Sequence, residues 1–207
     1  MGYSPDETMK LSYQDVGNFV FGGKNMEISV GVSNRHIHLC RNDLDKLFGK
    51  DYELTIRRVL SQSGDYACEE VVSLRNKDKI IENVRIIGPV RKYTQVELAK
   101  SDADYLGLNP PIRDSGDLSN SEDITIIGPK GEIFAKNSCI IAARHIHINS
   151  REYPNLNTGD IVSVRTKDSI IDNVHIKKAD DYSLELHIDK DDSLRFGLGN
   201  GDIVTLE

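Results

Sequence analysis

The sequence predicts a mainly β fold, either a barrel or a sandwich, built from two related halves. Short runs rich in β-branched residues recur from residue 28 onward, and turns containing Gly, Asn, Asp or Pro separate them. One long segment also occurs twice at a fixed offset. Helical spacing is limited to brief stretches, so alternating strand–helix units are not expected.

The chain begins with a polar segment, residues 1–25, that is expected to be a loosely docked tail; a short docking helix or an interaction peptide is the alternative. A strand is predicted at 28–32. A helix is predicted at 42–48, where Leu44 and Leu47 share a helical face and a glycine follows. The remaining strands are predicted at 54–60, 66–74, 80–87, 94–98, 124–127, 139–142, 161–165, 170–176, 184–188 and 203–206.

The internal repeat relates the two halves of the chain. Residues 73–86 match residues 163–176 at an offset of 90. The two copies of Arg-His-Ile-His are offset by 109 (145 − 36), so the first half holds 19 more residues (109 − 90) than the second. These extra residues must lie within 39–72, and we expect them around 62–70. The sequence therefore predicts two homologous β-domains, the first with an insertion.

The duplicated His-Ile-His motif is the main candidate for chemistry. The copies are His36 and His38, and His145 and His147. Side chains at i and i+2 of a strand point to the same face, so each copy presents two imidazoles together. A lone strand histidine is more often a hydrogen-bonded structural residue. A duplicated pair in strand context instead favours two metal sites.

The repeat supplies each pair of histidines with a third candidate ligand. At the offset of 90, Glu97 in the first half aligns with His187 in the second. A carboxylate and an imidazole both bind metals, although a solvated strand carboxylate remains the alternative for Glu97. Three protein ligands with an open position are typical of a catalytic zinc site. His175 aligns with Arg85, which is not a metal ligand, so we expect His175 at the surface.

Other polar residues near the motifs have weaker signals. Arg91 has no basic counterpart in the second half, and it is either a surface residue or a clamp for an anion beside the metal. Arg35 and Arg144 precede the histidines and are expected to form structural ion pairs. Cys139 is expected to be a buried structural thiol, whereas Cys40 is a weak candidate for an additional ligand.

Composition limits the function classes. The chain has 207 residues and a net charge of −7, which argues against nucleic acid as the partner. No apolar run approaches the roughly 20 residues that cross a bilayer, and no secretory signal is expected at the N-terminus. Three cysteines do not form a disulfide framework, so a cytoplasmic location is the default.

Several motifs in the same order make the chain resemble the PduL-type phosphotransacylases, the phosphate propanoyltransferases. The resemblance extends over about residues 28–207. The motifs are GVSNRHIHL at 31–39, an LSQ-x-G element at 60–69, a GP-x-R-x-x-TQVE element at 88–97, RDSGDL at 113–118, ARHIH at 143–147 and LHID at 186–189.

The resemblance implies two similar β-barrel domains with short capping helices and a metal site in the cleft between them. It implies that residues 26–34 join residues 143–207 in one barrel, and that residues 35–142 form the other. It also implies a dimer and two metal ions, generally zinc, although other divalent metals are compatible. One metal would bind His36, His38 and Glu97, and the other His145, His147 and His187.

The same resemblance implies the activity, which is reversible transfer of a short acyl group, propanoyl or acetyl, between coenzyme A and inorganic phosphate. Arg91 matches the arginine that contacts phosphate, and Ser115 matches a residue near coenzyme A. Asp65 departs from the family pattern, which often has Gln there. Residues 1–25 are a candidate targeting extension for a bacterial microcompartment. A dinuclear zinc hydrolase acting on a thioester or amide, and a non-catalytic zinc-stabilised module, are the rival interpretations.

Overall fold

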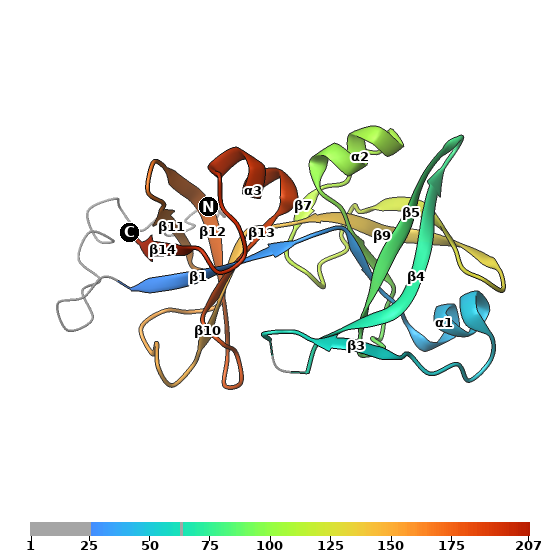
Figure 1. Ribbon diagram of the computed structural model, residues 1–207, viewed down its shortest axis with the longest axis horizontal. Helices are drawn as coiled ribbons and strands as arrows, with labels where there is room; N and C mark the ends of the chain where they lie inside the picture. Colours follow the sequence, from blue (N-terminus) through green and yellow to red (C-terminus); the bar gives the residue numbers. More distant parts are fainter. Residues whose placement is uncertain (1–25, 63) are drawn as a thin grey trace, which may run out of the picture.

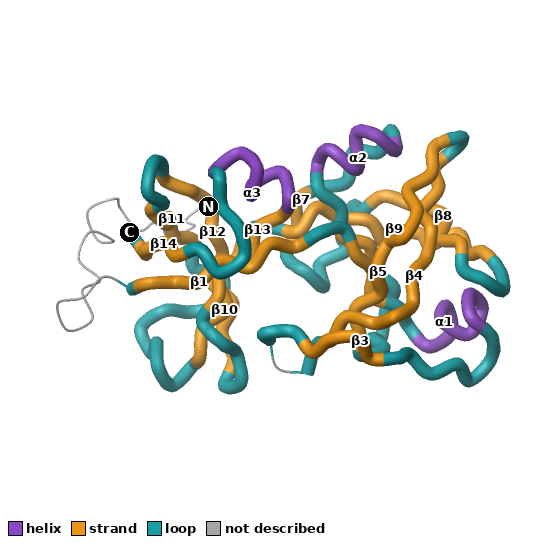
Figure 2. Tube along the Cα trace, viewed as in Figure 1, coloured by secondary structure: helices purple, strands orange, loops and turns teal. Residues whose placement is uncertain are grey.

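The computed structural model describes residues 26–207 except residue 63, so the candidate targeting extension lies outside the described residues. Two β bodies lie side by side along the long axis of the molecule, with three short helices at their periphery (Figures 1 and 2). This arrangement confirms the predicted mainly β class with two barrels and short helices. Among the described residues, no helix has the length and hydrophobicity that crossing a bilayer requires.

The C-terminal barrel is a closed ring of six strands. The ring closes because β1 pairs with β13 in parallel and with β14 in antiparallel orientation. Its core contains alternate residues of these strands, such as Ile28 and Val30 of β1, and α3 (Lys190–Phe196) follows β13. In ring order the strands are β1 (Glu27–Ser33), β13 (Glu185–Asp189), β10 (His145–Asn149), β12 (Ile170–Ala179), β11 (Ile161–Arg165) and β14 (Ile203–Leu206).

The N-terminal barrel is a second ring of six strands. It closes because β8 pairs with both β4 and β9. In ring order the strands are β4 (Tyr66–Asn76), β5 (Lys79–Gly88), β2 (His36–His38), β6 (Gln95–Glu97), β9 (Glu132–Ala142) and β8 (Glu122–Ile127). Outside this ring, β3 pairs with β4 and β7 pairs with β9. The elements outside the ring are α1 (Arg41–Phe48), β3 (Ile56–Val59), α2 (Lys100–Leu106) and β7 (Ile112–Arg113).

The internal repeat is visible in the backbone. Elements β2, β4, β5, β6 and α2 of one barrel correspond to β10, β11, β12, β13 and α3 of the other. Asn83 and Asn173, which are 90 residues apart, have matching positive φ values of 59° and 56°. Gly107 and Gly197, also 90 apart, end α2 and α3 in the left-handed conformation. The two halves therefore repeat both their strand order and their turns.

The chain crosses between the barrels twice. It leaves β1 in the C-terminal barrel and enters β2 in the N-terminal barrel, and it leaves β9 in the N-terminal barrel and enters β10 in the C-terminal barrel. Each His-Ile-His motif therefore begins directly after a crossing. This strand pairing supports our proposal that the domain boundaries fall after residues 34 and 142.

An arginine at each crossing is tied to the helix of the barrel that the chain enters. Arg35 donates to Asp102 of α2 at 3.0 Å, and Arg144 donates to Asp192 of α3 at 2.7 Å. Lys190 of α3, in the C-terminal barrel, also donates to Asp102 at 2.5 Å. Asp102 therefore connects the two barrels. Both arginines thus form the ion pairs expected from the sequence.

The insertion in the first half differs from the prediction. The 11-residue segment 150–160 that separates β10 from β11 has no helix or strand, whereas the corresponding part of the first half contains α1, β3 and the start of β4. The expected range 62–70 overlaps only the end of this insertion. The buried carboxylate of Glu70 anchors it by accepting hydrogen bonds from Tyr52 Oη and the Thr55 backbone N–H, each at 3.0 Å.

Candidate metal centre

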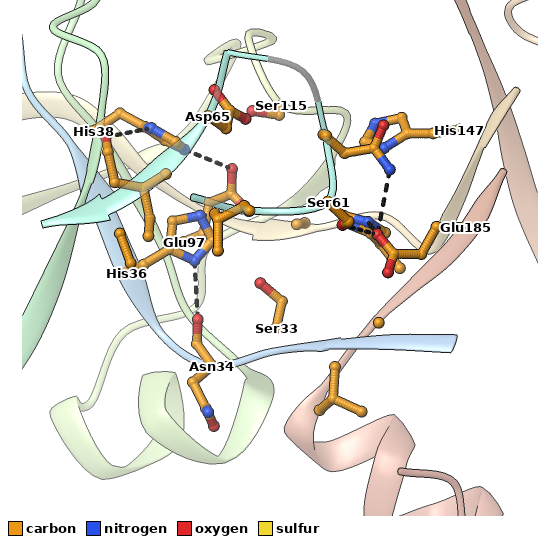
Figure 3. A pocket seen from close by; sticks show the side chains of 18 of the residues that line it. Ser33, Asn34, His36, His38, Ser61, Asp65, Glu97, Ser115, His147 and Glu185 are labelled. Carbon is orange, nitrogen blue, oxygen red and sulfur yellow. Dashed lines mark hydrogen bonds and ion pairs between the residues drawn. The ribbon is translucent and has the colours of Figure 1, made fainter. Parts of the chain in front are cut away.

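A cavity of about 1300 Å³ opens between the two barrels, and residues of both barrels line it. The residues predicted to bind metal, phosphate or coenzyme A all line it, with the exception of the weak candidate Cys40: His36, His38, Arg91, Glu97, Ser115, His145, His147 and His187. Figure 3 shows that His36, His38 and Glu97 lie on one side and that His147 and Glu185 lie on the other. The crossings of the chain explain this convergence because each one starts a His-Ile-His strand at the interface.

The first cluster joins two neighbouring strands of the N-terminal barrel. Antiparallel pairing of β2 with β6 places His36 directly opposite Glu97. The Nε2 atom of His36 lies 3.5 Å from Glu97 Oε2, and that of His38 lies 3.9 Å from Glu97 Oε1. One ligand atom from each residue lies within 4.8 Å of the others, so the three side chains can share one metal ion.

Backbone carbonyls orient the histidines of this cluster. His36 Nδ1 lies 2.9 Å from the Asn34 carbonyl, and His38 Nδ1 lies 3.0 Å from the Ile87 carbonyl. A carbonyl can only accept, so Nδ1 carries the proton and the lone pair is on Nε2, which faces Glu97. This is the outer-shell arrangement that metal-binding histidines use.

The second cluster repeats this geometry in the C-terminal barrel. Antiparallel pairing of β10 with β13 places His145 opposite His187. One nitrogen from each of His145, His147 and His187 lies within 4.8 Å of the others. His145 Nδ1 donates to the Ala143 carbonyl at 2.8 Å, as His36 does to Asn34. His147 Nδ1 is buried without a hydrogen-bond partner among the described residues, as expected of a nitrogen kept for a metal.

Burial controls the protonation of three of these histidines, His38, His145 and His147. Burial, with a contribution from His36, lowers the pKa of His38 to about 3. Burial, followed by the charges of His187 and Lys177, lowers the pKa of His147 to about 3, and burial takes that of His145 well below its usual value. Burial opposes ionisation of Glu97, but its neighbours His36 and His38 hold its pKa down to about 2. At neutral pH His38, His145 and His147 are therefore neutral and Glu97 is ionised, which are the forms that bind metals.

These pKa values predict that the metal-free protein loses stability when the pH falls from 6.5 to 5. His38 and His147 have pKa values of about 3 when folded and 6.5 when unfolded, so in this window only the unfolded chain takes up their protons. Their stabilisation is complete above pH 6.5 and is lost below it, by up to about 1.4 kcal/mol per pH unit for each histidine. Urea unfolding of chelator-treated protein at several pH values measures this slope.

The control for this prediction is a variant in which both His38 and His147 are replaced by Gln. It should show a clearly shallower slope in the same window, because the two shifted groups are gone. An equally steep slope in the double variant would assign the pH dependence to other groups.

Arg91 lies at the cavity beside the first cluster. Its backbone N–H donates to the Leu39 carbonyl at 2.9 Å, which places it near the end of the first His-Ile-His strand. Its side chain is one-quarter exposed, and its guanidinium lies 3.5 Å from the Asp65 carboxylate. Arg91 is thus a cavity residue with one carboxylate partner, which favours the anion clamp over the surface interpretation.

Comparison with known proteins assigns the chain to a family. The family model described as phosphate propanoyltransferase matches residues 29–198. The phosphate propanoyltransferase of Thermotoga maritima is 46% identical over 187 residues, which cover 87% of this chain and 89% of that protein. The chain belongs to the phosphate propanoyltransferase family. Proteins with the same name from Lachnoclostridium phytofermentans and Rhodobacter capsulatus are 42% and 41% identical, over 89% and 86% of this chain and 89% and 85% of their own lengths.

The site of this phosphate propanoyltransferase family member contains residues that the sequence interpretation missed. Glu185 lies 2.6 Å from His187 Nε2 and also accepts hydrogen bonds from Ser61 and Gln62 of the other barrel. Burial opposes its ionisation, but the bonds from His187 and Ser61 hold its pKa at about 2. Glu185 precedes His187 by two residues in β13, so the argument used for His-Ile-His could have found it.

The sequence interpretation also missed the buried Gln95, although the same two-residue strand period could have found it. It precedes Glu97 by two residues in β6. Its amide donates to Glu97 at 2.6 Å and to the Ser115 hydroxyl at 2.7 Å, and it accepts from the Gly116 backbone N–H at 2.8 Å. Gln95 therefore holds the RDSGDL segment against the first cluster of this phosphate propanoyltransferase family member, which accounts for the position of Ser115 in the cavity.

The remaining candidates lie outside the two clusters. Cys139 and Cys68 are buried free thiols, and burial raises their pKa values to about 12 and 11. Cys40 is half-buried, and Thr94 Oγ1 lies 3.6 Å from its sulfur. His175 was expected at the surface, but it is partly buried and bonds to Asp114 at 3.0 Å. The repeat alignment missed this contact because Asp114 reaches His175 from the other barrel.

Proposed function

We propose that the protein transfers a short acyl group, propanoyl or acetyl, reversibly between coenzyme A and inorganic phosphate to give an acyl phosphate. The observation that carries the proposal is a single cavity that brings together two three-residue metal-ligand clusters and Arg91. The relatives named phosphate propanoyltransferase, at 41–46% identity over most of the chain, support the same activity.

We infer one divalent metal ion, zinc by the nature of the ligands, at each cluster. His36, His38 and Glu97 would hold the first ion, and His145, His147 and His187 the second. When bound, the ions supply Lewis acidity for the thioester carbonyl or the thiolate and neutralise phosphate charge. The first ligand set is anionic and the second is neutral, so the two sites differ in net charge.

Arg91 would bind and orient the phosphate. A guanidinium can donate two parallel hydrogen bonds to phosphate oxygens, which fixes the orientation of the nucleophile as well as its position. Its present partner is Asp65 at 3.5 Å, so phosphate would compete with that carboxylate for Arg91.

Coenzyme A would occupy the rest of the cavity. Three arginines, Arg57 and Arg58 of β3 and Arg85 of β5, also line it and suit the phosphates of this substrate. Ser115 is proposed to contact coenzyme A. Its hydroxyl accepts from Gln95 beside Glu97, which favours a contact near the reacting end of the molecule.

We propose direct transfer without an acyl-enzyme. A phosphate oxygen attacks the thioester carbonyl, the C–S bond breaks, and the sulfur leaves as thiolate. No cysteine of the chain belongs to either cluster, and two of the three are buried thiols with raised pKa values. The contribution of the chain is orientation, which can lower the barrier by roughly 7–11 kcal/mol.

We expect the purified, metal-loaded protein to release free thiol from propanoyl-CoA only when inorganic phosphate is present. A thiol reagent follows the release, and hydroxylamine traps the acyl phosphate. A rate series over acyl chain length then measures the substrate preference. Release at the same rate without phosphate would instead select the dinuclear hydrolase, and no release under either condition would select the non-catalytic module.

We further propose a homodimer in the cytoplasm, with residues 1–25 as a targeting extension for a bacterial microcompartment. The resemblance described above supports both parts. Sedimentation at several protein concentrations tests the dimer. Copurification with shell proteins, compared between the full chain and a chain lacking residues 1–25, tests the targeting.

A further inference from the structure

Lys177 lies inside the cavity although neither its sequence context nor the repeat marked it. It pairs with His147 in the parallel register of β10 and β12, so the two side chains share a face of the sheet. Only 16% of its side chain is exposed, and it lines the cavity. The position 90 residues earlier is Ile87, so this cation occurs in only one half of the repeat.

The ammonium group of Lys177 has a carboxylate partner in the other barrel. Lys177 Nζ lies 3.8 Å from Asp114 Oδ1, which is longer than a hydrogen bond. The second oxygen of Asp114 accepts from His175 Nδ1 at 3.0 Å. Asp114 Oδ1 is buried without a hydrogen-bond partner among the described residues. The Asp114 carboxylate is therefore fixed by His175 and leaves donor capacity on the lysine for a ligand.

The charge of Lys177 acts on both metal-ligand clusters. It contributes to lowering the pKa of His145 and His147 in one cluster and of Glu97 in the other. Burial is the largest cause that lowers the pKa of Lys177 itself; Asp114 and Glu97 oppose this, and Arg91 reinforces it. Lys177 is thus within electrostatic reach of both clusters and of Arg91.

The buried position of the Lys177 ammonium group is energetically unfavourable unless an anion occupies the cavity. A largely buried ammonium group loses hydration, and one carboxylate at 3.8 Å compensates for this only in part. Metal ions at the two clusters would add positive charge on both sides of it. A phosphate between the clusters would offset all of these charges at once.

We propose that Lys177 is a second phosphate-binding residue, which contacts the substrate from the C-terminal barrel while Arg91 contacts it from the N-terminal barrel. The Asp114 carboxylate, which His175 fixes in place, competes with phosphate for the ammonium group. This inference rests on the proposed function because it names a further residue for the same substrate. A purely structural Lys177 would serve only to connect the barrels through Asp114.

The test compares three variants of the full-length, metal-loaded protein. Lys177→Met should raise the KM for phosphate about 10- to 100-fold, the effect of losing one charged hydrogen bond, and leave the KM for acyl-CoA within about twofold. Lys177→Arg keeps the cation and should restore most of the phosphate affinity. Asp114→Asn removes the competing charge and should lower the KM for phosphate.

Lys178→Met is the matched control, since it makes the same charge change one residue away. The Lys178 ammonium donates to the backbone carbonyls of Pro154 and Leu156, and Lys178 does not line the cavity. This control should leave the KM for phosphate unchanged. Calorimetric titration of each variant with inorganic phosphate gives a binding constant independent of turnover.

The outcomes separate the inference from the proposed function. Unchanged phosphate affinity in Lys177→Met overturns the inference, even if thiol release remains phosphate-dependent. If Lys177→Met fails to fold, Asp114→Asn decides, because a rise in the KM for phosphate contradicts the inference and a fall supports it. If the native protein shows no phosphate-dependent release, the proposed function fails. Calorimetry then still decides whether Lys177 binds phosphate.

Discussion

Replacing Glu97 with Gln should remove one metal ion per chain and lower turnover about a thousandfold. Glu97 is the only anionic member of the first cluster, and its ligand atom lies within 4.8 Å of those of His36 and His38. The amide is neutral and a poorer ligand, so the first site loses the charge that distinguishes it from the second. A thousandfold loss corresponds to about 4 kcal/mol, which is within the several kcal/mol that a Lewis-acidic ion contributes.

Metal content measured by elemental analysis distinguishes the two sites. The native protein should contain two ions per chain, and Glu97→Gln and His187→Gln should each contain one. His175→Gln is the matched control because His175 is the one histidine outside the clusters; it should keep both ions. Full metal occupancy in Glu97→Gln would remove Glu97 from the ligand set, whatever happens to turnover.

The residues of both candidate ligand clusters could be predicted from the sequence because two simple regularities bring them together. The two-residue period of a strand places the histidines of each motif on one face. The offset of the repeat then aligns Glu97 with His187, and the structure brings each of them opposite the first histidine of its motif. These relations are local or repeated, so a single sequence contains them.

Contacts between segments far apart in the sequence could not be predicted in this way. Strand β1 pairs in parallel with β13, where Ser29 aligns with Glu185 more than 150 residues later, and only the resemblance indicated this pairing. Asp114 reaches His175 and Lys177 from the other barrel. The contacts of Asp114 have no counterpart in the repeat, so no sequence offset could reveal them. The expected position of the insertion covered only its end, because the offsets count the extra residues without locating them.

Replacing Arg91 with Ala should raise the KM for phosphate at least about a hundredfold and leave the KM for acyl-CoA nearly unchanged. The Arg91 side chain is three-quarters buried at the cavity, and its guanidinium has one carboxylate partner, Asp65. Loss of a partly buried charged group that binds an anion costs roughly 2–5 kcal/mol, and a hundredfold effect corresponds to about 2.7 kcal/mol. Steady-state kinetics with each substrate varied in turn measures the two constants separately.

The control variants decide whether Arg91 acts as a specific phosphate ligand or only as a positive charge. Arg91→Lys keeps the charge but cannot donate two parallel bonds, so it should recover only part of the phosphate affinity. Asp65→Asn removes the competing carboxylate and should lower the KM for phosphate. Arg75→Ala makes the same charge change at an exposed pair with Glu132, outside the cavity, and should have no effect. If Arg75→Ala and Arg91→Ala weakened phosphate binding equally, the effect would come from net charge, and Arg91 would have no specific role.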